Sequence, residues 1–189
     1  MMRVLLALPL PLMLLGCGTA RQSPGALQQY QSMKTELLAV TRDSTLCAQS
    51  SITVSRDMAK SRAVAARRAS GALSVRAARL RTQAREVAGR VARLIQRTSP
   101  SSGAGRYLRR IEKSLHYDEL EGAALRAVST LIRADPWLES GNNSRRLRRL
   151  SRRARWASRM ATAEALAAGR LIRAHRDSFR YTPVRISRS

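Results

Sequence analysis

The sequence predicts an all-α fold, with three or four long helices in an antiparallel bundle or coiled-coil-like arrangement. Two segments place apolar and small residues at alternating steps of three and four, the pattern of a helix that buries one stripe. Short segments rich in glycine, serine and proline separate the periodic stretches and indicate loops. No segment alternates polar and apolar residues as a half-buried strand would, so no strand pattern competes with the helices.

The first helix is predicted over residues 26–40. Its apolar side chains recur at helical spacing: Leu27, Tyr30, Met33, Leu37 and Leu38. The serine- and threonine-rich segment 41–54 fits either a helix break or a continuation of this helix. In the second case it packs Leu46, Cys47 and Ile52 into the core.

The clearest periodicity lies in residues 73–94, where a heptad seam persists for three repeats. Its members are Leu73, Ala77, Leu80, Ala84, Val87, Val91 and Leu94. Small residues extend the seam upstream and allow close helix approach: Ala59, Ala63, Ala66 and Ser70. One flank of the seam is basic, which we interpret as a solvated helix face rather than a docking strip. It carries Arg76, Arg79, Arg90, Arg93 and Arg97.

A loop over residues 99–105 leads to a third helix predicted over 107–134. Its inward residues are expected to be Leu108, Ile111, Leu115, Leu120, Ala124, Val128 and Leu131. Pro136 ends it, because proline disfavours helical geometry in the preceding residue. The last helix is predicted over 145–175, with a second heptad-like seam of Leu147, Leu150, Ala154, Ala157, Ala161, Ala165, Ala168 and Ile172.

The first seventeen residues have the layout of an export signal, with Arg3 before an apolar run that a small residue and a cysteine close. The motif Leu14-Leu15-Gly16-Cys17 resembles the lipobox of bacterial lipoproteins. The resemblance implies cleavage before Cys17, which then carries diacylglycerol on its thiol and an acyl chain such as palmitate on its amine. A plain secretory signal and a start without a leader are the alternatives. The run is too short for a comfortable transmembrane helix.

The resemblance implies a lipoprotein signal peptide (1–16) and a lipidated tether (17–25), and the residue patterns beyond them predict a helical domain (26–177) and an extended or disordered tail (178–189). It implies a lipid-anchored protein of the cell envelope. Aspartate after the lipidated cysteine is associated in the family with inner-membrane retention, and here that residue is Gly18. In a Gram-negative cell we therefore expect the outer membrane, facing the periplasm. Otherwise we expect the outer face of the cell membrane.

The chain has 36 basic and 12 acidic residues, for a net charge of +24, and nearly all the basic residues are arginines. Codon bias from a GC-rich genome accounts for part of this excess. The remaining charge requires anions, since self-repulsion at such a net charge destabilises a compact state. Export directs the search to headgroups, lipopolysaccharide phosphates, teichoic acids and acidic wall polymers. Nucleic acid becomes the natural partner only if the leader is not processed, in a cytoplasmic protein.

The densest basic feature is a cluster of seven arginines that surrounds Leu147, Leu150 and Ala154, with Trp156 among them. A basic amphipathic helix with a tryptophan can lie on an anionic membrane, and phosphate-bearing polymers fit equally well. In the alternative interpretation the two leucines pack into the bundle while the arginines are solvated or meet acidic residues near Glu119. The candidate anion-binding residues are Arg145, Arg146, Arg148, Arg149, Arg152, Arg153 and Arg155.

Enzyme chemistry has little support, because no nucleophile elbow or phosphate-binding loop is present. Glu112, His116 and Glu119 share one helical face, but a bundle metal site needs matching ligands from other helices. We expect no metal, and we expect the acidic residues of this segment to pair with arginines: Glu112, Asp118, Glu119 and Glu121.

Lipidation of Cys17 would leave Cys47 as the only free thiol. A lone cysteine in an oxidising compartment is either buried or bridged between two chains, and we favour burial.

These observations predict a non-enzymatic, lipid-anchored envelope protein with a structural or adaptor role. Its arginine-rich surface would bind anionic lipid, an anionic polymer or an acidic partner protein. The alternative is a helical subunit of an envelope secretion, conjugation or transport complex, in which the heptad seams pair with partner helices or with a second copy. Translation of a chance reading frame is a further alternative, which two in-phase heptad seams argue against.

Overall fold

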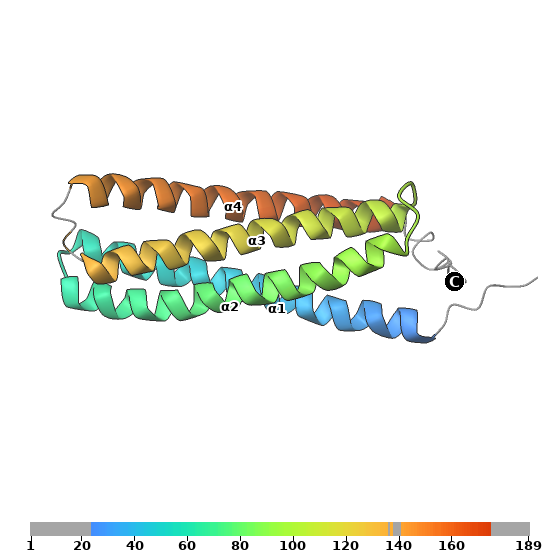
Figure 1. Ribbon diagram of the computed structural model, residues 1–189, viewed down its shortest axis with the longest axis horizontal. Helices are drawn as coiled ribbons and strands as arrows, with labels where there is room; N and C mark the ends of the chain where they lie inside the picture. Colours follow the sequence, from blue (N-terminus) through green and yellow to red (C-terminus); the bar gives the residue numbers. More distant parts are fainter. Residues whose placement is uncertain (1–23, 136, 138–140, 175–189) are drawn as a thin grey trace, which may run out of the picture.

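The computed structural model describes residues 24–135, 137 and 141–174, and this part of the chain is an all-α bundle. Four helices follow in order: α1 (Pro24–Ala59), α2 (Ala63–Gln96), α3 (Gly103–Ala134) and α4 (Gly141–Ala174). They alternate in direction along one common axis, and no strand occurs within the described ranges (Figure 1). The predicted fold class is confirmed. The predicted signal peptide, most of the tether and the tail lie outside the described residues.

Helix α1 is continuous, so the segment 41–54 continues the helix rather than breaking it. Four of its hydroxyl groups donate to carbonyls four residues earlier, as Thr41 does to Leu37 at 3.0 Å, so these groups do not compete with the helix. Ile52 is 60% exposed, and the expectation that it packs inward is wrong. The helix begins at Pro24, a residue type suited to the first helical turn, two residues before the predicted domain boundary. Its buried apolar residues lie seven apart: Met33, Val40, Cys47 and Val54.

Helix α2 buries the predicted seam, and all of its members are buried except Leu94, which is half-buried. The upstream extension is interrupted by a tight turn in which Ser61 adopts a φ of 53°, in the left-handed region. This turn separates α1 from α2, so Ala59 ends the first helix and is exposed instead of extending the seam. Ala66 and Ser70, beyond the turn, are buried as expected.

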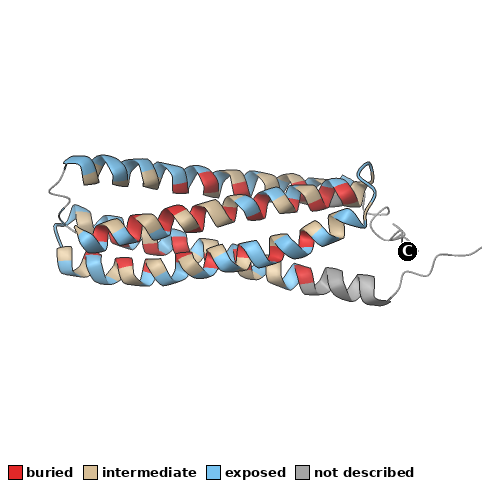
Figure 2. Ribbon diagram, viewed as in Figure 1, coloured by how far each residue is buried: buried red, intermediate tan, exposed pale blue. Residues whose placement is uncertain are grey.

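Helices α2 and α3 form the central pair, with α1 packed along α2 and α4 packed along α3. Buried residues follow the inner faces of the helices over most of their length (Figure 2). Gly122 allows a close approach of the central pair, because a Cβ there would lie 2.7 Å from the carbonyl oxygen of Ala77. Ser129 supports the same contact by donating a hydrogen bond to the carbonyl of Ser70.

Helix α3 begins four residues earlier than predicted, because Ser102 caps it by accepting a hydrogen bond from the Gly105 amide at 2.9 Å. Most of its predicted inward residues are buried, while Leu120 and Leu131 are half-buried.

Helix α4 also begins four residues earlier than predicted, at Gly141. It buries Ala154, Ala157, Ala161 and Ala168. Ala165 is exposed, contrary to the predicted seam, and the side chains of Ile172 and His175 lie outside the description. No helix among the described residues is long and apolar enough to cross a membrane.

Candidate anion-binding surface

The seven predicted anion-binding residues all lie in the N-terminal half of α4, and each of them is exposed. Leu147 and Leu150 are half-buried against the core and Ala154 is buried, so these three set the helix orientation. Because the inward stripe is apolar, the arginines are left on the remaining circumference of the helix. We call these seven residues, Arg145, Arg146, Arg148, Arg149, Arg152, Arg153 and Arg155, the α4 arginine face.

Within the described part of the chain, no carboxylate lies within 4.0 Å of any guanidinium of the α4 arginine face. Two of the arginines bond only to neighbours in their own helix. Arg148 donates to the Ser144 hydroxyl at 3.0 Å and Arg145 donates to the Gly141 carbonyl at 3.3 Å. Both partners are neutral, so they leave the positive charge of this face uncompensated.

The acidic residues near Glu119 do not pair with the α4 arginine face, contrary to one of the expectations from the sequence. The Glu119 carboxylate binds two arginines of α2 instead, Arg85 at 2.5 Å and Arg81 at 3.8 Å. Glu164 of α4 pairs with Arg110 of α3 at 2.7 Å. These carboxylates therefore connect neighbouring helices and are already occupied.

The basic flank of α2 is not merely solvated, because three of its five arginines contact α1. Arg79 pairs with Asp43 at 3.0 Å, and Arg90 pairs with Glu36. Arg76 donates to the Ser50 hydroxyl at 2.6 Å. Arg93 and Arg97 are exposed, as we predicted for the whole flank. The partners of the other three arginines were not recognised from the sequence.

A signal for these contacts does exist in the sequence. Glu36, Asp43 and Ser50 recur every seven residues along one stripe of α1. Their partners fall in the reverse order along α2, as antiparallel packing requires. The seven-residue spacing of these three polar residues in α1 therefore indicates the register of α1 against α2, which was not recognised from the sequence alone.

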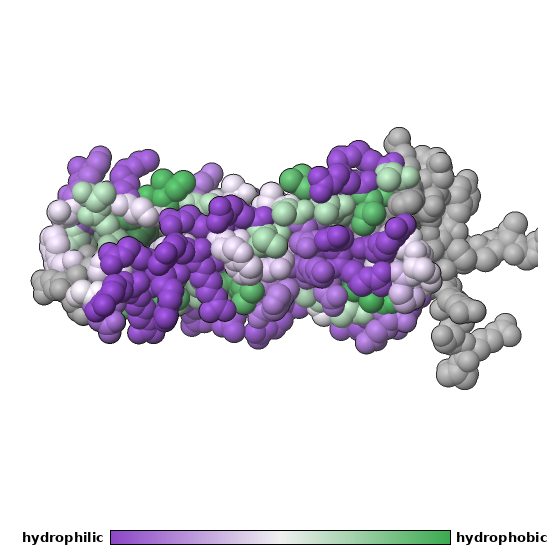
Figure 3. All heavy atoms as spheres, turned by 90° about the horizontal axis from the view of Figure 1, so that it is seen from above, coloured by the Kyte–Doolittle hydropathy of each residue, from purple (hydrophilic) through white to green (hydrophobic). Residues whose placement is uncertain are grey.

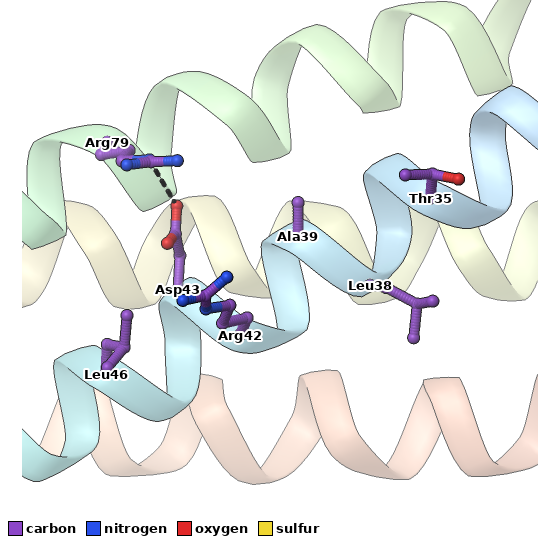
Figure 4. Close-up of a pocket in the computed structure, with 7 residues that line it drawn as sticks. All are labelled: Thr35, Leu38, Ala39, Arg42, Asp43, Leu46 and Arg79. Carbon is purple, nitrogen blue, oxygen red and sulfur yellow. Dashed lines mark ion pairs between the residues drawn. The ribbon is translucent and has the colours of Figure 1, made fainter.

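Figure 4 shows Asp43 directed from α1 toward α2, where Arg79 meets it, while Leu38 points away from α2. These residues line an open depression of about 430 Å³ between the two helices. Arg42 and Arg79 are its only cationic lining residues, and Asp43 already neutralises one of them. The depression is therefore a poorer anion site than the α4 arginine face.

Trp156 lies beside the arginines at the boundary between α4 and α3, and 44% of its surface is exposed. Its ring meets Tyr117 of α3 edge-on, with 5.4 Å between the ring centroids. Such an edge-to-face contact holds one side of the indole and leaves the other side open to solvent. The position of Trp156 among the arginines agrees with the sequence prediction, whereas the role of Tyr117 was not recognised.

Two carboxyl groups of α3 are buried without an arginine partner, contrary to the expected ion pairs. Asp118 is 8% exposed and Glu121 is 3% exposed. Glu121 accepts hydrogen bonds from Ser44 of α1, at 3.0 Å, and from Ser158 of α4. Burial, and then the neighbouring Glu121, raise the pKa of Asp118 to about 7. Burial likewise raises the pKa of Glu121, an effect that the two serine hydrogen bonds reduce.

Cys47 is fully buried in the same region of the bundle, as we favoured from the sequence. Burial and then the nearby carboxylates of Glu121 and Asp43 raise the pKa of its thiol to about 12, while Arg76 opposes the shift. A buried neutral thiol behaves as a small apolar side chain. This position does not favour a bridge between two chains.

The one predicted histidine-carboxylate face does occur on α3. Glu112, His116 and Glu119 line an open depression of about 490 Å³ between α2 and α3. Glu119 is held there by arginines, and no group of three potential ligands converges among the described residues. The geometry offers no closed set of metal ligands in this part of the chain.

Comparison of this chain with protein-family models, with curated proteins and with solved structures found no match. The assignment of a function therefore depends on the chemistry of its own residues.

Proposed function

We propose that this protein is a non-enzymatic, lipid-anchored component of the bacterial cell envelope whose α4 arginine face binds phosphate-bearing anions. In this proposal the lipid on Cys17 holds the chain at a membrane, and the helical bundle presents the arginines. Gly18 after the anchor favours the outer membrane of a Gram-negative cell. The role is structural or adaptor-like: the protein connects its membrane to an anionic lipid or polymer, or to an acidic protein.

One observation supports the anion-binding part of the proposal. Seven guanidinium groups on half of one helix are exposed, and no described carboxylate lies within ion-pair distance of them. Their mutual repulsion is relieved when an external anion binds. The guanidinium fork donates two parallel hydrogen bonds to phosphate oxygens, which suits arginine better than lysine to this chemistry.

The alternative of a subunit in an envelope complex depended on seams that pair with foreign helices. The seam of α2 is buried within the chain, as are most of the inward alanines of α4. Little of either seam is left for another helix. We therefore prefer anion binding through the exposed arginines.

The test uses chains that carry Cys17→Ser, so that no lipid anchor retains them, and replaces all seven arginines of the α4 arginine face by glutamine. Retention is measured on phosphatidylglycerol vesicles and on lipopolysaccharide. With its native arginines the unanchored chain should bind both matrices in a steeply salt-dependent manner, as counterion-linked binding does. The variant should lose this binding. Retention that persists in the variant, or that ignores salt, would refute the proposal.

A matched control removes the same number of charges from exposed positions elsewhere. It replaces Arg56, Arg62, Arg67, Arg68, Arg93, Arg97 and Arg133 by glutamine. If the location of the α4 arginines matters, this control keeps most of the binding despite its identical net charge. Equal losses in both variants would mean that net charge alone is responsible.

The anchor is tested separately through Cys17→Ser and incorporation of labelled palmitate. The native chain should incorporate the label and fractionate with membranes, and the variant should do neither. Absence of lipid on the native chain would contradict the envelope assignment and favour the cytoplasmic nucleic-acid alternative.

A further inference from the structure

The outer side of α4 carries exposed apolar side chains among its cations. Trp156 is 44% exposed and Leu166 is 59% exposed. Leu166 lies ten residues further along α4 and about 80° around the helix from Trp156, and both residues are away from the inward stripe. Three further exposed cations lie toward the C-terminal end of α4: Arg159, Arg170 and Arg173. A polymer of phosphates needs only the charges, whereas apolar side chains gain free energy when they enter a lipid interface.

Hydrophilic residues cover most of the molecular face seen from the α4 side, interrupted by small hydrophobic patches (Figure 3). A helix with a strongly basic side and a few protruding apolar residues is typical of a segment that lies in the plane of a bilayer surface. Tryptophan is favoured at that depth because its ring is apolar and its N–H is polar.

The position of the α4 arginine face along the bundle limits how it can reach a membrane. Helix α1 begins at one end of the bundle and α4 begins at the other (Figure 1). At 1.5 Å per residue, the arginines lie roughly 25–45 Å from the end where α1 begins. The electrostatic potential of an anionic membrane surface decays in solution over a Debye length of about 10 Å. A bundle standing upright on its N-terminal anchor would therefore hold these arginines beyond the reach of the same membrane.

We infer that the bundle lies lengthwise on an anionic bilayer, with the outer side of α4 against the headgroups and Trp156 and Leu166 inserted between them. This inference depends on the proposed function and names its ligand as anionic lipid in the membrane that holds the anchor. Six residues lie between Cys17 and Pro24, the start of α1, and a chain of this length spans at most about 25 Å from Cys17 to Pro24. Neighbouring helix axes are about 8–10 Å apart, so this tether can pass from α1 around to the α4 side.

The experiment uses the full acylated chain in vesicles with brominated acyl chains, which quench tryptophan on contact. The chain has two tryptophans, so Trp137→Phe leaves Trp156 as the sole reporter. Two further reporters are Leu166→Trp and Val75→Trp, each with both native tryptophans replaced by phenylalanine. Val75 is 71% exposed on α2, two residues from the buried Leu73 and therefore nearly opposite the inward stripe of that helix, and it serves as the matched control.

In vesicles containing phosphatidylglycerol, the reporters at positions 156 and 166 should be quenched together and shift their emission to the blue. The reporter at position 75 should remain unquenched. In purely zwitterionic vesicles the anchor still retains the chain, but none of the three reporters should be quenched. The variant in which glutamine replaces all seven residues of the α4 arginine face should behave in anionic vesicles as the native chain does in zwitterionic ones.

Three results would overturn the inference in different ways. Salt-dependent binding without quenching at 156 and 166 would mean that the arginines bind an anion while the bundle does not lie on the lipid, so the proposed function would survive alone. Quenching at all three positions would mean insertion without a preferred face. Loss of both quenching and salt-dependent binding would remove the inference together with the proposed function.

Discussion

The arginines of α2 and those of α4 look alike in the sequence but have different surroundings in the structure. The α2 arginines Arg79, Arg85 and Arg90 meet carboxylates of α1 and α3. Those of the α4 arginine face meet no described carboxylate within 4.0 Å. Arginine content alone therefore does not identify a binding surface, and the location of the acidic residues decides which cations remain available.

The largest expected effect comes from giving α4 the acidic partners that α2 already has. The triple variant Arg148→Glu, Arg152→Glu and Arg155→Glu places carboxylates within helical reach of the remaining arginines. Each basic residue near an anionic surface contributes about 1 kcal/mol, and each new carboxylate adds repulsion. In the Cys17→Ser chain, which has no lipid anchor, we expect binding to phosphatidylglycerol vesicles to weaken at least about a hundredfold. Cosedimentation at several salt concentrations measures it, and a fully retained affinity would contradict the comparison.

A second prediction concerns the buried carboxyl groups of α3, which lack arginine partners just as the α4 arginine face lacks described carboxylate partners. Because the pKa of Asp118 is raised from 3.8 to about 7, the folded chain keeps a proton that the unfolded chain releases. The free energy of unfolding should therefore fall as the pH rises from about 4 to about 7, and level off above that. Asp118→Asn should stabilise the protein by about 2 kcal/mol at neutral pH and flatten most of this dependence.

Urea unfolding at several pH values measures this effect, with Asp57→Asn, half-buried near the C-terminal end of α1, as a control. Some dependence should remain in Asp118→Asn, because Glu121 is buried beside it and its pKa is also raised. A stability that rises with pH over the same range would show that Asp118 is charged and paired in the folded chain.

The third prediction tests the paired arginines of α2. Asp43→Asn removes the carboxylate that Arg79 contacts and should lower the free energy of unfolding by about 1 kcal/mol. The expected loss is modest because the Arg79 side chain is 66% exposed and solvent screens the pair. A double-mutant cycle with Arg79→Gln isolates the pair itself. Vesicle binding should not change, and a large loss of binding would mean that α2 also contacts the anion.

The smallest effect is expected for a single change in the α4 arginine face. Arg149→Gln should weaken binding by about fivefold, corresponding to about 1 kcal/mol, because it removes one of several similar contacts. Its free energy of unfolding should remain within about 0.5 kcal/mol of the native value, since the side chain is exposed and unpaired with any described carboxylate. Thermal unfolding and cosedimentation measure the two quantities, and a larger loss of stability would reveal a structural role.

The heptad seam of α2 shows how much of the fold was predictable. From Leu73 to Val91 every predicted inward residue is buried. The prediction succeeded because helical periodicity is a property of the chain's own geometry, about 3.6 residues per turn. The exposure of the seven α4 arginines was predictable for the same reason, since Leu147, Leu150 and Ala154 occupy the inward stripe.

The sequence by itself thus determined the all-α class, the stripes that form the core and the position of the densest arginine cluster. Only the tertiary structure decided that Glu119 binds α2 and leaves α4 without that partner, and that Asp118 and Glu121 are buried without arginines. It also placed the starts of α1 and α4 at opposite ends of the bundle. The reason is that helix periodicity depends on neighbours along the chain, whereas charge pairing depends on which helices pack together and in what register.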